Sequence, residues 1–339
     1  MRKPLVLAPL LAVTALVLAG CGTTSVAEPR GGTTATTAEC AADTKTATGP
    51  VTLTDAIGRT VKLDKPAERV AVLEWQQVED ALTLCVTPVA VADAAGYRQW
   101  DTSIALPDGV ADVGKRQEPN LDALFATKPD LVIVEAQTRD DAIIGQLEKY
   151  GVPVLVTVGA DAKDPLRQLR ATFDLIAQAT GRTERAEAVT AELNAHLETA
   201  KQTIAAAKPA STDFVYIDGW VDAGTVSLRP FGSGSLIGAI GAELGLTNVW
   251  KGETDPAYGL GSTDIEGMTT IGSATLLHTG TDDPDSTSFI AAAEKNPAWA
   301  TIPAVKEKRV HAFPTGIWTF GGPRSAERIA DAYVDVFGK

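Results

Sequence analysis

The sequence contains few of the residues that usually carry catalysis or bind metal ions. Only three of its 339 residues are histidines, His196, His278 and His311, and none lies in an H-E-x-x-H arrangement. The C-x-x-C, G-x-S-x-G and G-x-x-x-x-G-K-[ST] patterns are also absent. These absences argue against an enzyme and against an iron or zinc centre held by protein ligands. A catalytic triad assembled from distant residues stays open at this point.

Positive charge is also in short supply. The chain has 30 basic and 43 acidic residues, which gives a net charge of −13 at pH 7. Removal of residues 1–20, which hold two basic residues and no acidic ones, would bring the net charge to −15. Because a strongly acidic protein repels nucleic acid and anionic lipid headgroups, we expect neither as a binding partner.

Long apolar runs are missing except near the N-terminus, where one short run predicts export. Residues 5–18 are largely apolar, follow two basic residues and lead to Ala-Gly-Cys ending at Cys21. The run is too short to span a bilayer, so we predict a lipoprotein signal peptide over 1–20 and lipidation of Cys21. The alternative is an ordinary signal peptide with a chance cysteine.

The next segment predicts a tether. Residues 21–50 are rich in Thr, Ala, Gly and Ser and cannot bury enough apolar surface to fold. We therefore expect a protein anchored by lipid to the extracytoplasmic face of the cell membrane, with no other membrane contact.

Cysteine is scarce as well. Besides Cys21, the chain has only Cys40 and Cys85. Outside the cytoplasm two remaining cysteines suggest a disulfide, and we predict that these two pair. Two free thiols are the alternative that the sequence leaves open.

Short β-branched runs alternate with helical patterns along the rest of the chain. Nearly continuous apolar strands separated by helices indicate parallel sheets covered on both faces. The predicted strands are residues 69–73, 88–92, 130–134, 153–157, 213–217, 274–278 and 309–313. The predicted fold class is therefore α/β.

Residues 165–207 interrupt this alternation, because they carry no strand signal. Pro165 opens one helix, and apolar residues at helical spacing continue a second helix from residue 183 to about 207. We therefore predict two Rossmann-like lobes with parallel-rich sheets joined by a single long helix. The predicted parts are the N-terminal lobe 51–182, the interlobe helix 183–208 and the C-terminal lobe 209–339.

Aromatic residues make up only 6% of the chain, yet several follow predicted strands or sit among turn residues. Loops at the carboxyl ends of strands build the ligand crevice of α/β sheets, and aromatic walls suit a bulky, partly apolar ligand. Arg116 is the leading polar anchor, because a guanidinium donates several hydrogen bonds in a fixed fork. A surface salt bridge is the alternative for a lone arginine. The aromatic candidates are Trp75, Trp100, Tyr258, Trp318 and Phe320.

Several segments, taken together and in order, carry a family resemblance. They are L-E-W-Q-Q-V at 73–78, Y-R-Q-W at 97–100, D-V-G-K-R-Q-E-P-N at 112–120, N-V-W-K-G-E at 248–253, N-P-A-W at 296–299 and W-T-F-G-G at 318–322. The chain resembles the ferric-hydroxamate-binding lipoproteins, iron–siderophore substrate-binding proteins of ABC transporters. They belong to the siderophore and vitamin B12 class of periplasmic binding proteins. The resemblance implies two lobes joined by one long helix, the class III architecture.

The resemblance also implies roles for single residues. Arg116 would contact hydroxamate oxygens around the iron, and Trp100, Trp318 and Phe320 would line the pocket. Phe320 stands where the family has Tyr, and Tyr258 where a relative has Trp. The family's pocket Tyr after the third strand is missing, and E-A-Q-T-R at 135–139 takes its place.

The function implied is capture of a ferric siderophore and its delivery to a membrane permease. The siderophore already saturates the iron, so we expect no cofactor and no metal ligand from the protein, with iron arriving only inside the ligand. We expect a monomer that binds one permease dimer, with Asp122 and Glu266 as docking carboxylates, one on each lobe. Acidic residues near helix starts are also favoured by the helix dipole alone. The alternatives are ferric citrate, haem or corrinoid cargo and, more distantly, an extracytoplasmic α/β hydrolase.

Overall fold

The computed structural model describes Cys40 and residues 46–280 and 288–339. The predicted signal peptide, Cys21 and most of the predicted tether lie outside the described residues. In the described part of the chain, no helix combines the length and the apolar character needed to cross a membrane.

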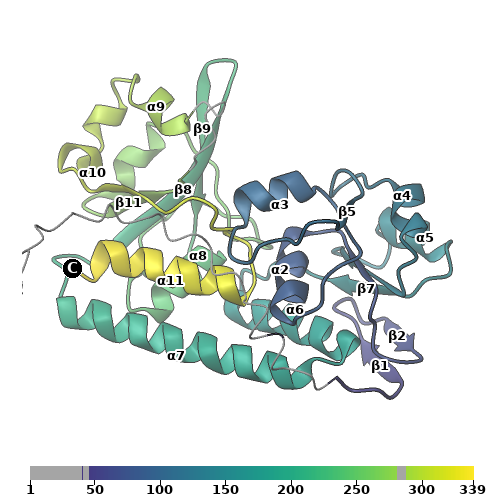
Figure 1. The fold of residues 1–339 in the computed structure, drawn as a ribbon. Coiled ribbons are helices and arrows are strands. Elements are labelled where there is room, and N and C mark those ends of the chain that lie inside the picture. The colour runs from purple at the N-terminus through teal and green to yellow at the C-terminus, as the bar shows by residue number, and fades with distance from the viewer. Residues whose placement is uncertain (1–39, 41–45, 281–287) are drawn as a thin grey trace, which may run out of the picture. The chain divides into compact units, whose positions relative to one another are not determined.

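The N-terminal lobe is built on a five-stranded parallel sheet (Figure 1). In spatial order its strands are β5 (Ala111–Asp112), β4 (Ala90–Val91), β3 (Val70–Val72), β6 (Leu131–Glu135) and β7 (Val154–Thr157). Its helices are α2 (Trp75–Thr83), α3 (Ala94–Trp100), α4 (Leu121–Ala126) and α5 (Ala142–Glu148). An antiparallel hairpin of β1 (Val51–Thr54) and β2 (Thr60–Leu63) precedes the sheet.

Successive residues of these strands enter two different cores. In β6, Leu131 and Ile133 pack with α2, α3 and α6 (Pro165–Thr180), whereas Val132 and Val134 pack with α4 and α5. Side chains of a strand alternate between its faces, so a strand covered on both sides needs apolar residues at every position. This burial explains the nearly continuous apolar runs in the sequence.

The C-terminal lobe has a second sheet with one antiparallel member. β10 (Thr247–Asn248), β8 (Asp213–Asp222), β11 (Thr275–His278) and β12 (Val310–Ala312) run parallel, and β9 (Thr225–Phe231) pairs antiparallel with β8. Its helices are α8 (Leu236–Glu243), α9 (Phe289–Ala293), α10 (Pro303–Lys306) and α11 (Pro323–Phe337), with 3-10 turns η1 (Gly267–Ile271) and η2 (Trp299–Thr301).

The long helix α7 (Thr183–Ala207) contributes to the cores of both lobes (Figure 1). Ala186 and Val189 belong to the N-terminal core, and Leu193, Leu197 and Ile204 belong to the C-terminal core. Their spacing of three, four or seven residues places them on one helix face. The predicted connection between the lobes is therefore one continuous helix with a single apolar stripe.

A buried polar seam joins α2 of the first lobe to the start of α11 in the second. Glu79, which is fully buried, accepts hydrogen bonds from the backbone N–H of Gly322 and Ser325, both at 2.9 Å, and from Ser325 Oγ at 2.6 Å. A helix leaves its first N–H groups unpaired, and here a carboxylate from the other lobe satisfies them. This contact fixes the segment before α11, which supplies part of the pocket described below.

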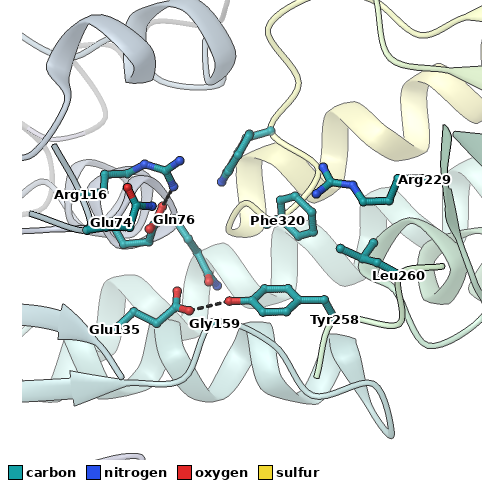
Figure 2. A pocket seen from close by; sticks show the side chains of 11 residues that line it. Glu74, Gln76, Arg116, Glu135, Gly159, Arg229, Tyr258, Leu260 and Phe320 are labelled. Carbon is teal, nitrogen blue, oxygen red and sulfur yellow. Dashed lines mark hydrogen bonds and ion pairs between the residues drawn. The ribbon is translucent and has the colours of Figure 1, made fainter. Parts of the chain in front are cut away.

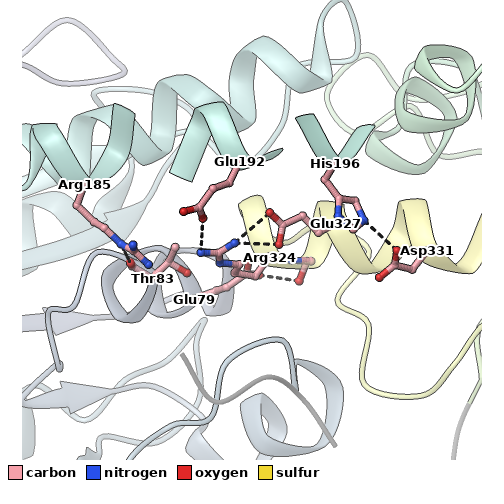
Figure 3. A network of polar contacts seen from close by, with 9 residues as sticks. Glu79, Thr83, Arg185, Glu192, His196, Arg324, Glu327 and Asp331 are labelled. Atoms are coloured by element: carbon pink, nitrogen blue, oxygen red, sulfur yellow. Dashed lines mark hydrogen bonds and ion pairs between the residues drawn. The ribbon is translucent and has the colours of Figure 1, made fainter. Parts of the chain in front are cut away.

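Ion pairs continue along α7 and α11 beyond this seam (Figure 3). Arg324 contacts Glu192 on α7 at 2.8 Å and Glu327 at 3.0 Å. His196 lies 2.8 Å from Asp331. These contacts hold the two helices side by side.

Sequence and structure differ at several elements. The sequence analysis did not predict the β1–β2 hairpin, helix α3 or strand β9. These elements are short and contain many polar residues, so their sequences lack the apolar runs that mark the buried strands. The predicted pairing of Cys40 with Cys85 is confirmed, because the structure joins these residues by a disulfide, 45 positions apart in the chain.

Candidate functional site

A pocket of about 430 Å³ lies between the two lobes, where strands of the N-terminal sheet end. Glu74 follows β3, Glu135 ends β6, and Gly159 lies just past β7. Figure 2 shows Glu74 and Arg116 on one side and Arg229, Leu260 and Phe320 on the other. The lining residues are Glu74, Gln76, Arg116, Gln117, Glu135, Gly159, Arg229, Tyr258, Leu260, Trp318 and Phe320. This is the usual position of the ligand crevice in α/β folds.

Arg116 is held between a ring and a carboxylate. Its guanidinium carbon lies 3.8 Å from the ring centroid of Trp75, and its Nη1 pairs with Oε1 of Glu74. Trp75 is buried, and its Nε1 donates to the carbonyl of Asp93 at 3.1 Å. Stacking and the ion pair together fix the direction in which the guanidinium donates.

The aromatic residues form one continuous edge-to-face chain across the lobes. Trp318 lies 4.7 Å from Trp75 and 5.2 Å from Phe320 between ring centroids. Phe320 in turn lies 5.6 Å from Tyr258. Such T-shaped contacts add to the burial of the rings and stiffen their positions. They provide the site with a preformed apolar wall.

Glu135 and Tyr258 join the lobes on a third side of the pocket. The Tyr258 hydroxyl donates to Oε1 of Glu135 (Figure 2). Burial raises the pKa of Glu135, an effect opposed by the Tyr258 bond, while Glu74 adds to the rise and Arg116 lowers it. Burial and the nearby Glu135 carboxylate raise the pKa of Tyr258. The carboxylate packs against Gly159 so closely that any side chain there would collide with it.

Arg229 is a second pocket arginine, and sequence reasoning missed it. It lies directly across from Asp218 in the β8–β9 pairing and forms a two-pronged ion pair with that carboxylate. Its guanidinium carbon lies 5.9 Å from the ring of Phe320. The D-A-G-T turn at 222–225 is the signal that could have revealed this hairpin.

The structure separates the six predicted ligand residues into two groups. Arg116, Tyr258, Trp318 and Phe320 line the pocket. Trp75 lies behind Arg116 as a buried support, and Trp100 ends α3, where it packs against the N-terminal core. Neither Trp75 nor Trp100 is among the lining residues. The prediction placed Trp100 in a loop after the second strand, whereas the structure places it at the end of α3.

Both proposed docking carboxylates are exposed, and other residues make the nearby cap hydrogen bonds. Asn120 caps α4 by accepting from Ala123 N–H, so Asp122 does not do so. Before η1, Asp264 accepts from Gly267 N–H, and Glu266 makes no cap bond. Their side chains are therefore not occupied by capping the helices on which they lie.

Most of the chain matches one protein family. Residues 70–315 match the family model described as periplasmic binding protein. The chain belongs to this family. Members of the family are binding proteins, and the match spans both lobes and the long helix, so the pocket between the lobes is the place to look for a ligand.

Relatives within the family carry different cargo names. The iron(3+)-hydroxamate-binding protein FhuD of Escherichia coli strain K12 is 29% identical over 263 residues, covering 76% of this chain and 83% of FhuD. The Fe(3+)-citrate-binding protein YfmC of Bacillus subtilis strain 168 is 28% identical over 303 residues, covering 84% of this chain and 85% of YfmC.

A solved structure shares the fold. The crystal structure of FhuD from Vibrio cholerae with Fe3+-Desferal superposes with a TM-score of 0.66 at 22% identity. The superposition covers 80% of this chain and 98% of the Vibrio cholerae FhuD chain. The predicted fold class of two α/β lobes joined by one long helix is confirmed.

Proposed function

We propose that this protein is the extracytoplasmic solute-binding component of an ABC importer and captures a ferric siderophore of the hydroxamate type. The observation that carries the proposal is the oriented Arg116 fork beside an aromatic wall, in a pocket of about 430 Å³. The likeness to FhuD, named for iron(3+)-hydroxamate, supports the cargo.

The physical basis is recognition of a complex whose iron is already saturated. A hexadentate hydroxamate surrounds Fe(III) with hard oxygen donors, so the protein need not supply an iron ligand. Arg116 would donate to the ligand's oxygens, and Trp318, Phe320 and Tyr258 would pack against its carbon chains. Iron is cargo here, and the protein itself needs no cofactor for this task.

Fluorescence titration tests the proposal directly. Trp318 lines the pocket, so a bound ferric complex should quench its emission. We expect saturable quenching by ferrioxamine B and ferrichrome, and weaker or no quenching by ferric dicitrate, haem and a corrinoid. Preference for ferric dicitrate, haem or the corrinoid would reject hydroxamate cargo. In a separate activity assay, turnover of generic esters would support the hydrolase alternative.

Ferric citrate is the second candidate, because YfmC is also similar. A ferric citrate complex is anionic and would favour several basic residues facing the pocket. Both lining arginines are already paired with carboxylates, Arg116 with Glu74 and Arg229 with Asp218. This pairing favours the hydroxamate.

Membrane attachment is part of the proposal. Cys21, preceded by small residues, would carry the lipid and leave the folded lobes on a tether. We expect Cys21→Ser to release the protein from the membrane fraction with unchanged ligand affinity. Mass spectrometry of the mature wild-type N-terminus that finds an unmodified Cys21 would contradict acylation.

Docking to a permease dimer is proposed through Asp122 on α4 and Glu266 beside η1. Asp122→Ala combined with Glu266→Ala should keep ligand affinity and slow uptake into liposomes that contain the cognate permease. The matched control removes two other exposed carboxylates, Glu187 on α7 and Glu294 beside α9. Wild-type uptake by the first double variant would place docking on other residues.

A further inference from the structure

Both pocket arginines have anionic partners of their own. Arg116 pairs with Glu74, and Arg229 pairs with Asp218 through Nε at 2.8 Å and through Nη2. Asp93 also lies 4.0 Å from Arg116, but it does not line the pocket. Each pair is close to neutral when viewed from the pocket. The net charge that a ligand meets is therefore set by the other charged residues that line the pocket.

Among the described lining residues, the other charged side chain is that of Glu135. Its carboxylate forms no ion pair within the described part of the chain, and it accepts a hydrogen bond from the neutral Tyr258 hydroxyl. It stands at the end of β6, half-buried, and Figure 2 shows it directed across the pocket toward Tyr258. Oε1 is used by Tyr258, which leaves Oε2 to accept a further hydrogen bond.

We infer that Glu135 is the subsite for a cationic group on the ligand, and that the preferred cargo is a ferric hydroxamate with a protonated terminal amine. The inference rests on the proposed function and specifies its substrate class. Three hydroxamates neutralise Fe(III), so one ammonium gives such a complex a net charge of +1. This positive charge would complement Glu135, the unpaired carboxylate among the described lining residues, whereas an anionic ferric complex would be repelled by it.

The charged groups that act on Glu135 agree with this assignment. Glu74 opposes its ionisation, and Arg116 favours it from beyond ion-pair distance. Burial raises the pKa of Glu135, and an ammonium placed against Oε2 would act in the opposite direction by favouring the charged carboxylate. The tyrosine on the other side holds the carboxylate in place for that contact.

The test compares two ligands that differ only in this charge. Ferrioxamine B carries a terminal ammonium, and its N-acetyl derivative is neutral with the same iron centre. We expect wild-type protein to bind ferrioxamine B about tenfold more tightly at pH 7, which corresponds to about 1.4 kcal/mol. Glu135→Gln should bring the ratio near one. Glu118→Gln is the matched control, because Glu118 is an exposed carboxylate in the Arg116 loop that does not line the pocket.

Each outcome has one meaning. A wild-type preference that disappears in Glu135→Gln and persists in Glu118→Gln supports the inference. Equal binding of both ligands by wild-type protein, or a preference that Glu135→Gln leaves intact, overturns it and leaves the proposed function standing. Binding of neither ligand contradicts the proposed function, and the inference with it.

Discussion

Helix α2 brings acidic side chains into two contrasting regions, the pocket at its start and the seam at its middle. Glu74 at the N-cap lines the pocket and has a cationic partner, Arg116. Glu79 is fully buried and accepts hydrogen bonds from donors at the start of α11 (Figure 3). Asp80 is also fully buried, and neither of its oxygens has a hydrogen-bond partner among the described residues.

The difference shows that the partner decides the role of a carboxylate. Beside a cation in an open pocket, Glu74 can orient Arg116 for a ligand. Against the orphan N–H groups of another helix, Glu79 becomes a structural link between the lobes. Pocket changes should therefore alter binding, and seam changes should alter stability.

The largest effect is expected at Glu79. Glu79→Ala leaves the start of α11 without its acceptor inside the protein and should lower the free energy of unfolding by about 3 kcal/mol, since three hydrogen bonds of about 1 kcal/mol each are lost. Denaturant unfolding measures it. Glu192→Ala, an exposed carboxylate on α7 next to the same network, should cost at most about 1 kcal/mol. An equal decrease in the free energy of unfolding for both variants would contradict the claim that the buried seam contributes more stability than the surface ion pairs.

The next effect is expected in the pocket. Arg116→Ala should weaken binding of a ferric hydroxamate by about 1.5–3 kcal/mol, the range for a hydrogen bond that involves a charged group. The unfolding midpoint should change little. Arg98→Ala on α3, outside the pocket, is the control and should retain wild-type affinity. Unchanged affinity in Arg116→Ala would remove Arg116 from the binding site.

A smaller effect of opposite sign is expected at Asp80. Burial raises its pKa well above the usual range, with Glu79 and Asp101 adding to the rise. The folded state therefore binds more protons, and this group lowers stability as pH rises from 3.8 through its folded pKa. Asp80→Asn should stabilise the protein by about 1–2 kcal/mol at pH 8. The gain should shrink toward pH 4 in unfolding curves, and a gain independent of pH would contradict the cause given.

The smallest effect is expected at the outer edge of the seam. Asp331 raises the pKa of His196 above its ordinary value of 6.5, mainly through their hydrogen bond. The stabilisation is fully present below pH 6.5 and is lost as pH rises through the folded pKa. Because the His196 side chain is 36% exposed, solvent screening limits it to about 0.5 kcal/mol. Asp331→Asn should weaken but not abolish this pH dependence, as followed by thermal unfolding between pH 5 and 8, because Glu327 also makes a smaller contribution to the raised pKa.

Much of the fold could be predicted because a strand buried on both faces has a nearly continuous apolar sequence. The runs at 130–134 and 153–157 correspond to β6 and β7, and the helix predicted from 183 to about 207 is α7. The β1–β2 hairpin and β9 could not be found in the same way. Their residues face solvent or the pocket on one side, so their apolar signal is weak.

The candidate site was predicted less completely. Arg116, Tyr258, Trp318 and Phe320 were identified from motifs and lie in the pocket. Residue type alone could not distinguish an aromatic side chain that lines the pocket from one that supports a lining residue, and Trp75 packs against Arg116 without lining the pocket.

The sequence by itself determined the two α/β lobes, the long helix and the residues that could bind a ligand, because periodicity and residue type are local properties of the chain. Only the tertiary structure decided which charges meet. Glu135 faces Tyr258 across 123 positions, and Arg229 reaches the pocket through a strand pairing with Asp218. The energy of a charged group depends on its neighbours in space, so the charge balance of the pocket became visible only when the lobes were folded against each other.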